Sequence, residues 1–197
     1  MDPKQGYKNL QQPQILKLDD DFSLVKRFID GDKSTFRILV ERHKEKVRNI
    51  VYLTTNNGSL VDDISQEVFI TVYKNLNKFR FESQFTTWLY RITVNKCKDS
   101  LRRIKVRKIF VPDTDAEMKE SGENFVENDD VSKIVHRSIS KLPAKLRIPL
   151  LLKDIEGFSY QEIADTIHCE LGTVKSRIFR ARENLKKILK PLQSELL

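Results

Sequence analysis

Residues 159–187, SYQEIADTIHCELGTVKSRIFRARENLKK, predict two short helices joined by a tight turn. Ser159 with Glu162 three residues later has the pattern of a capping box, in which each side chain binds the other residue's backbone amide at the start of a helix. The helical period breaks over residues 168–172, and Thr173 is expected to cap the second helix. Steps of four, three and four then place apolar side chains on one buried face: Val174, Ile178, Ala181 and Leu185. A helix-turn-helix is therefore predicted.

The other faces of this second helix are basic, with one acid, Glu183, among the cations Lys175, Arg177, Arg180, Arg182, Lys186 and Lys187. In a helix-turn-helix, the N-terminal residues of the second helix contact base edges in the major groove. Arginine suits guanine and phosphate, while serine and threonine contact bases or backbone. DNA binding is therefore predicted for Thr173, Lys175, Ser176, Arg177, Arg180 and Arg182. A merely solvated basic face is the alternative.

The composition predicts a strongly helical chain with an anionic partner. Its 197 residues allow one or two small domains, and six glycines with six prolines leave little turn material for a large sheet. The net charge of +8 favours a partner such as nucleic acid. Residues 111–130 differ, because they carry eight acidic side chains and one lysine. They are predicted to be a tether between two basic bodies.

Metal, disulfide and membrane roles find no support in the sequence. Two cysteines, Cys97 and Cys169, are too few for a disulfide framework or a zinc site, and they fit a reduced, intracellular setting. Three scattered histidines, His43, His136 and His168, are expected at ordinary helix or turn positions. The N-terminus lacks the apolar core of a signal peptide, and no run approaches the length of a membrane span. We expect no metal and no cofactor.

The first half of the chain predicts a helical bundle after a polar tail of about 20 residues. Turns are expected at residues 30–32 and 56–58, followed by a helix over about residues 62–77. Its apolar side is expected to hold Ile64, Val68, Phe69, Val72, Tyr73 and Leu76, and its polar side includes Asp62, Asp63, Gln66 and Glu67. A metal-dependent nuclease acting through Asp62, Asp63 and Glu67 is disfavoured, because no histidine and no second carboxylate cluster accompany them.

An aromatic and basic loop, KFRFE at residues 78–82, precedes a helix expected to run from Ser83 to about Arg103. Phe79, Phe81 and Trp88 either belong to the core or stack on unpaired bases, since single strands need rings with cations beside them. Both alternatives stand. After the tether, about 60 residues of short helices form a second body, and so small a domain is expected to need support from a partner.

Three stretches in this order resemble a bacterial RNA polymerase sigma factor of the small extracytoplasmic-function (ECF) group of the sigma-70 family. They are DDISQEVFITVYKNLNKF, SQFTTWLYRITVNKCKDSLRR and LPAKLRIPLLLKDIEGFSYQEIADTIHCELGTVKSRIFRARENLKK. The resemblance covers residues 22–190. The helix-turn-helix alone is shared with response regulators and many repressors, whereas the combination is specific.

The resemblance implies an all-α protein of two small helical domains. Region 2 would span residues 21–105 after a tail at 1–20, and region 4 residues 132–192 after a flexible acidic linker at 106–131. Region 2 would bind the clamp coiled coil of the largest subunit of core RNA polymerase through Asp62, Asp63, Gln66 and Glu67. It would melt and read the promoter −10 element through Phe79, Arg80, Phe81, Trp88, Arg91 and Asn95. Region 4 would bind the −35 element through the helix-turn-helix.

The resemblance further implies a non-catalytic transcription factor with three kinds of partner: core RNA polymerase, promoter DNA and a cognate anti-sigma factor. The protein would be cytoplasmic, at the nucleoid or held at the membrane by that anti-sigma factor. Thr86 stands where the family commonly has arginine or lysine, so a backbone contact there is not expected. A stand-alone helix-turn-helix repressor or activator is the alternative, and it leaves the region 2-like half without a role.

Overall fold

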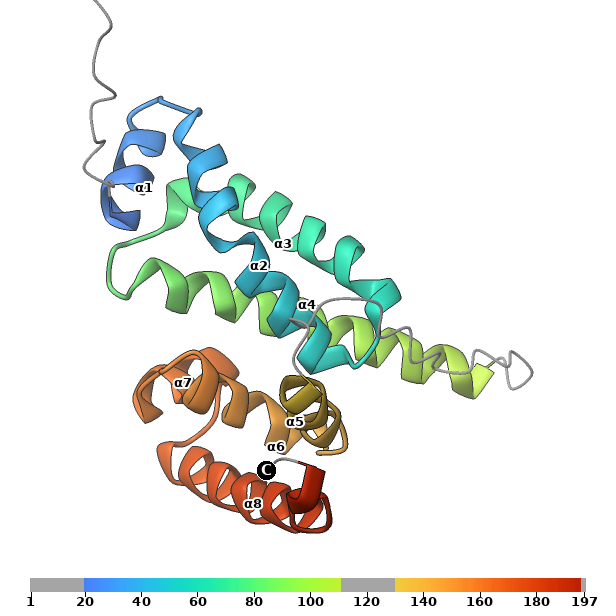
Figure 1. Ribbon diagram of the computed structural model, residues 1–197. Helices are drawn as coiled ribbons and strands as arrows, with labels where there is room; N and C mark the ends of the chain where they lie inside the picture. Colours follow the sequence, from blue (N-terminus) through green and yellow to red (C-terminus); the bar gives the residue numbers. More distant parts are fainter. Residues whose placement is uncertain (1–19, 111–129, 196–197) are drawn as a thin grey trace, which may run out of the picture.

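The computed structural model describes residues 20–110 and 130–195, and every regular element within them is helical (Figure 1). The main helices are α1 (Asp21–Ile29), α2 (Thr35–Thr55), α3 (Val61–Asn75), α4 (Phe85–Phe110), α5 (Asp130–Ser140), α6 (Ala144–Leu150), α7 (Tyr160–Ile167) and α8 (Leu171–Leu189). Short 3₁₀ helices form η1 (Gly58–Leu60), η2 (Leu76–Lys78) and η4 (Lys190–Glu195), and a short π-helix forms η3 (Leu151–Ile155). The expected all-α class is confirmed. The acidic segment 111–129 lies outside the described residues.

The first body, residues 20–110, is a bundle of α1 to α4. Asp20 caps α1 by accepting a hydrogen bond from the Ser23 amide at 2.7 Å, and the left-handed Asn56 (φ 53°) ends α2 where the sequence predicts a turn. Its core mixes aliphatic and aromatic side chains, and the largest that are fully buried are Tyr90, Phe28 and Phe85. Fully buried members include Leu24, Val47, Val68, Val72, Leu89 and Val94.

The second body, residues 130–195, contains the predicted helix-turn-helix as α7 and α8. Its capping box is confirmed: Ser159 Oγ accepts from the Glu162 amide at 3.2 Å, and Glu162 Oε2 accepts from the Ser159 amide at 2.9 Å. The prediction that Thr173 caps the second helix is wrong. Left-handed His168 and extended Glu170 complete the turn, so α8 begins at Leu171. Thr173 therefore lies in the first turn of α8.

Helix α4 also differs from its predicted extent, since it continues from Phe85 to Phe110 instead of ending near Arg103. Residues 104–110 contain neither glycine nor proline, and the first helix breaker is Pro112. The consequence is a helix whose C-terminal end projects from the bundle (Figure 1).

The two bodies pack against each other and share one hydrophobic core cluster. Helix α7 lies on α4, and α5 and α6 lie on the end of α2 (Figure 1). Buried Arg147 of α6 donates hydrogen bonds to the carbonyl oxygens of Thr54 at 2.7 Å and Ser140 at 2.6 Å. Thr54 lies in the last turn of α2, where a cation complements the helix dipole. The support that the small second body was expected to need is thus supplied in part by the first.

Candidate polymerase and promoter interfaces

Helix α8 buries one face and presents a basic one. Val174, Ile178 and Ala181 are at most 1% exposed. The exposed residues on the other side include Lys175, Ser176 and Arg180, while Thr173 and Arg177 are half-buried. The six predicted DNA-binding residues therefore share helix α8, and its N-terminal half exposes polar and basic side chains to solvent.

Two side chains of α8 behave differently from the sequence interpretation. Arg182 binds Asp154 with both Nε (3.0 Å) and Nη2 (2.5 Å), which raises its pKa and fixes the side chain against the end of η3. Phe179 is 68% exposed and was not among the predicted contacts. The sequence did indicate that Phe179 is exposed, because this residue falls outside the apolar steps of four, three and four.

The aromatic residues in and after the loop between η2 and α4 divide into core and surface positions. Phe79 is 5% exposed and packs on Phe85 and Trp88, with ring centroids 6.1 and 5.4 Å away. Phe81 is 40% exposed in a left-handed backbone conformation (φ 59°), held by Phe79 at 5.0 Å and by Phe22 of α1 at 5.7 Å. Phe79 is thus a core residue, whereas Phe81 and half-buried Trp88 present ring surface.

The predicted −10 residues on α4 form a stripe. Trp88, Arg91 and Asn95 are separated by three and four residues, so they lie on one side of the helix, and all three are half-buried. Arg80 is exposed in the loop beside them. The Arg91 Nε is buried and has no hydrogen-bond partner within the described part of the chain.

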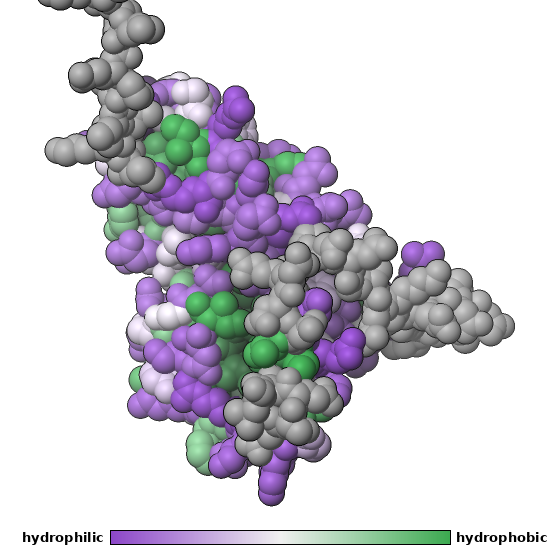
Figure 2. Space-filling model, in the orientation of Figure 1, coloured by the Kyte–Doolittle hydropathy of each residue, from purple (hydrophilic) through white to green (hydrophobic). Residues whose placement is uncertain are grey.

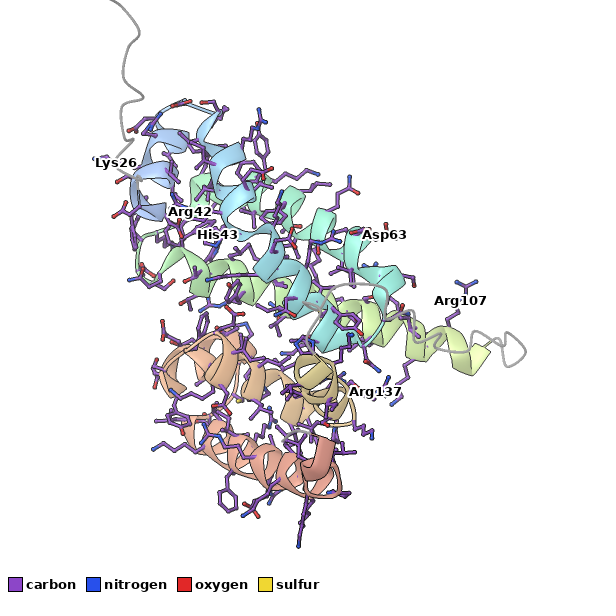
Figure 3. The ribbon with its side chains drawn as sticks, in the orientation of Figure 1. Lys26, Arg42, His43, Asp63, Arg107 and Arg137 are labelled. Carbon is purple, nitrogen blue, oxygen red and sulfur yellow. The ribbon has the colours of Figure 1, made fainter. Side chains whose placement is uncertain are left out.

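The predicted polymerase-binding residues of α3 are all exposed, and Asp63 points outward on the side away from the second body (Figure 3). Asp62 is paired with Arg48 of α2, and Glu67 with Lys96 of α4 at 3.2 Å. Each of these two acids therefore bridges α3 to a neighbouring helix. Among the described residues, no three His, Cys, Asp or Glu side chains are grouped to hold a metal ion.

A groove between α2 and α3 was missed by the sequence interpretation. One part, of about 530 Å³, is lined by Val40, Lys44, Glu45, Arg48, Asp62, Ser65, Gln66 and Phe69. The adjoining part, of about 410 Å³, is lined by Phe36, Val40, Gln66, Phe69, Ile70, Tyr73 and Lys74. Ile70 and Tyr73 are 45% and 46% exposed, so the prediction that Tyr73 belongs to the buried side of the helix is wrong. Ile64, Val68 and Val72 take the buried face, and Tyr73 falls at its edge.

Buried His43 has a structural partner. Its Nε2 lies 2.8 Å from Asp21, which also accepts from Arg42 at 2.6 Å (Figure 3). Burial opposes ionisation of Asp21, but the bonds from His43 and Arg42 outweigh it and hold the Asp21 pKa below its usual value. The cluster joins α1 to α2, consistent with the ordinary position expected for this histidine.

An interdomain seam lies along α4 beside the −10 stripe. From α4, the seam contains Thr87, Tyr90 and Lys98, and from the second body Glu156, Phe158, Glu162 and Ile167. Tyr90 donates to Glu156 at 2.9 Å and stacks on Phe158 with centroids 5.5 Å apart. Thr87 donates to Glu162 at 3.1 Å, and Lys98 donates to the Ile167 carbonyl at 3.4 Å.

The visible surface of the first body is mostly hydrophilic, and the larger apolar areas lie on the second body near the first (Figure 2). Within the described residues, no helix combines the length and apolarity that crossing a bilayer would require.

Comparison with known proteins identifies both bodies. Residues 39–107 match the family model of sigma-70 region 2, and residues 132–185 match that of sigma-70, region 4. The RNA polymerase sigma-H factor of Pseudomonas aeruginosa is 38% identical over 192 residues, covering 92% of this chain and 100% of the relative. The ECF RNA polymerase sigma-E factor of Escherichia coli is 40% identical over 180 residues, covering 86% and 94%.

Two solved structures share the fold at 24% identity. The sigma factor RpoE from Bartonella quintana, in complex with the anti-sigma factor NepR, has a TM-score of 0.64 and covers 79% of this chain and 96% of its own. CnrH, in complex with the cytosolic domain of CnrY, has a TM-score of 0.63 and covers 88% and 99%. The chain belongs to the ECF group of the sigma-70 family of RNA polymerase sigma factors.

Proposed function

We propose that this sigma factor directs promoter-specific transcription initiation through three separate surfaces, on α3, on α4 with its preceding loop, and on α8. The observation that carries the proposal is their separation: each lies on a different helix, and each has side-chain chemistry that suits a different partner. Region 2 is assigned to residues 21–105, the linker to 106–131 and region 4 to 132–192, after the tail at 1–20.

The α2–α3 groove is assigned to core RNA polymerase. Asp62, Asp63, Gln66 and Glu67 supply a polar rim, and Phe69, Ile70 and Tyr73 supply an exposed apolar part. An apolar centre with a polar rim is the usual anatomy of a protein interface, and a groove between helices accommodates a helical partner. The partner proposed is the clamp coiled coil of the largest subunit.

The loop and stripe are assigned to the opened −10 element. Phe81 and Trp88 offer ring surface on which an unpaired base can stack, with Arg80, Arg91 and Asn95 beside them. Phe79 is assigned a supporting role beneath Phe81, because it is buried. An exposed aromatic ring beside a guanidinium favours strand opening, because a base that stacks on the ring regains part of the free energy lost when its base pair breaks.

Helix α8 is assigned to the duplex −35 element. Thr173, Lys175, Ser176, Arg177 and Arg180 would face the major groove. Arg182 is held in one position by Asp154, so we assign its guanidinium to the DNA phosphate backbone and not to the bases.

The proposed partners follow from these assignments. A cognate anti-sigma factor is proposed because the structural neighbour RpoE is in complex with the anti-sigma factor NepR, and CnrH is likewise in complex with another protein, the cytosolic domain of CnrY. The protein would act in the cytoplasm without catalysis of its own, at the nucleoid with polymerase, or at the membrane when such a partner is anchored there.

Reconstituted transcription tests the proposal. Core polymerase is assayed with and without the chain on a library of promoter fragments, and start sites are mapped. We expect initiation at a shared two-part motif only when the chain is present. A chain that neither binds core nor directs initiation, yet shifts duplex DNA alone, would instead be a helix-turn-helix repressor or activator.

A further inference from the structure

We propose that helix α7 of the second body inhibits the −10 surface of the free sigma factor by holding the Glu162 carboxylate on α4 beside the predicted −10 residues. The proposal rests on the proposed function and adds a regulatory contact to it. Of the three surfaces assigned above, the one on α4 adjoins the interdomain seam. Inhibition therefore acts on single-strand binding at the −10 element.

A hydrogen bond from Thr87 of α4 to Glu162 Oε1, at 3.1 Å, places this acid. Trp88 is the next residue after Thr87, and Arg91 follows Thr87 by four residues. Residues four apart share one side of a helix, so Thr87 and Arg91 face the same way. The Glu162 carboxylate is therefore held about one helical turn from Arg91 along α4.

Glu162 is fixed in place and ionised. Its other oxygen, Oε2, accepts from the Ser159 amide at 2.9 Å in the capping box, so the side chain cannot turn away without uncapping α7. This backbone bond is the main cause that holds the pKa of Glu162 below its usual value, and the Thr87 hydroxyl contributes. Exposed Asp165 adds a second acid to α7, which contains no basic residue.

Both charge and volume oppose a bound strand at this position. Single-stranded DNA is held by cations that follow its phosphates and by rings on which its bases stack. A carboxylate beside those cations offsets their charge and repels phosphate. Thr87 and Tyr90 of α4 are at most 2% exposed, so this side of the helix is already covered. A strand that approaches Arg91 from the seam therefore meets repulsion and obstruction.

The −35 face of α8 is not covered in this way. Helix α7 packs on both α4 and α8, whereas Lys175, Ser176 and Arg180 of α8 stay exposed (Figure 1). The two promoter surfaces thus differ in the free protein, since one is open to duplex DNA and the other is obstructed.

Promoter geometry removes the contact. Elements named −35 and −10 lie about 25 base pairs apart, or about 85 Å along a straight duplex. Packed helices lie about 8–10 Å apart, so α8 and α4, with α7 between them, are only about 20 Å apart. One molecule cannot hold both elements until its two bodies separate. Separation withdraws Glu162 from α4 and relieves the inhibition.

The test measures binding of a labelled single-stranded DNA of mixed sequence to the full chain, free and assembled with core polymerase. Glu162→Gln removes the charge but keeps the capping pattern and an acceptor for Thr87. Tyr90→Phe removes an interdomain hydrogen bond without changing any charge at neutral pH. Glu183→Gln, at an exposed position on α8, is the charge-matched control.

In the free chain, we expect Glu162→Gln and Tyr90→Phe to bind the strand about fivefold more tightly than the wild type. The reason is that a weakened seam raises the fraction of molecules whose −10 surface is accessible, and the apparent affinity follows that fraction. Glu183→Gln should match the wild type. The gain should vanish when Arg91→Gln is added, and all single seam variants should match the wild type in the holoenzyme.

Equal affinities of the wild type and both seam variants in the free chain would overturn the proposal. A similar gain in Glu183→Gln would also overturn it, because the effect would then be one of net charge. So would a gain that persists in the holoenzyme, where the two bodies are separated. Initiation by the wild-type holoenzyme is scored in a separate assay, so failure of the proposed function is distinguished from failure of this contact.

Discussion

The Tyr90 hydroxyl donates a hydrogen bond to the Glu156 carboxylate at 2.9 Å, although the two residues belong to different bodies. Burial is the main cause that raises the pKa of both groups. Such a bond forms only while the second body is packed on the first, which we call the closed arrangement, and removal of the donor leaves a costly buried acceptor. Tyr90 and Glu156 therefore report on closure of the molecule.

Tyr90→Phe should shift the closed arrangement towards the open one by about fivefold or more, because an unsatisfied buried acceptor costs about 1–3 kcal/mol. Energy transfer between labels at the exposed positions of Arg37 and Glu183 measures the change. Tyr73→Phe, an exposed tyrosine in the α2–α3 groove, is the control. An unchanged distance distribution in Tyr90→Phe would contradict a role of this bond in closure.

Closure should also depend on pH through Glu156. Because its pKa is raised in the closed form, the closed form binds the proton more tightly, and closure weakens as pH rises above the ordinary value of 4.5. Tyr90 and Lys46 are the groups that oppose this shift. The same label pair, followed between pH 5 and 8, should therefore show tighter closure at the acidic end. Glu156→Gln should remove this dependence, and its persistence would point to another group.

Phe79→Ala and Phe81→Ala should separate stability from promoter opening. Loss of the buried Phe79 ring should cost about 3–5 kcal/mol of unfolding free energy, whereas the 40% exposed Phe81 should cost far less. Phe81→Ala should instead reduce strand opening by holoenzyme, measured by permanganate reactivity of unpaired thymines. Normal opening with Phe81→Ala would exclude the ring as a stacking surface.

Ile70→Lys should weaken binding to core polymerase about tenfold or more, because it places a charge in the apolar part of the groove. Ile38→Lys is the matched control, since both isoleucines are 45% exposed and Ile38 does not line the described groove. Competition for core against a labelled sigma factor measures the difference. Equal affinities of the two variants would move the polymerase surface elsewhere.

Local patterns predicted the helices well. The capping box at Ser159 and the apolar steps from Val174 to Ala181 depend on residues within one or two turns, and the structure confirms both. Packing of the second body on the first has no such signal. Arg147 resembles a surface cation in the sequence, and its partner Thr54 lies 93 residues away.

The groove on α3 was missed for a related reason. Tyr73 fits an apolar helical pattern, but only the neighbouring helices determine where the buried face ends. The end of α4 was underestimated, although residues 104–110 include no helix breaker and the helix continues through them.

Phe22 has a consequence for how this molecule can be divided. It lies on α1, before the start of the region 2 match at residue 39, and its ring packs on Phe79 and Phe81. The stretch shared across the family is therefore shorter than the physical unit that shapes the loop. A fragment cut at the family boundary would retain the loop residues without the ring behind them, so excised region 2 should begin no later than Asp20.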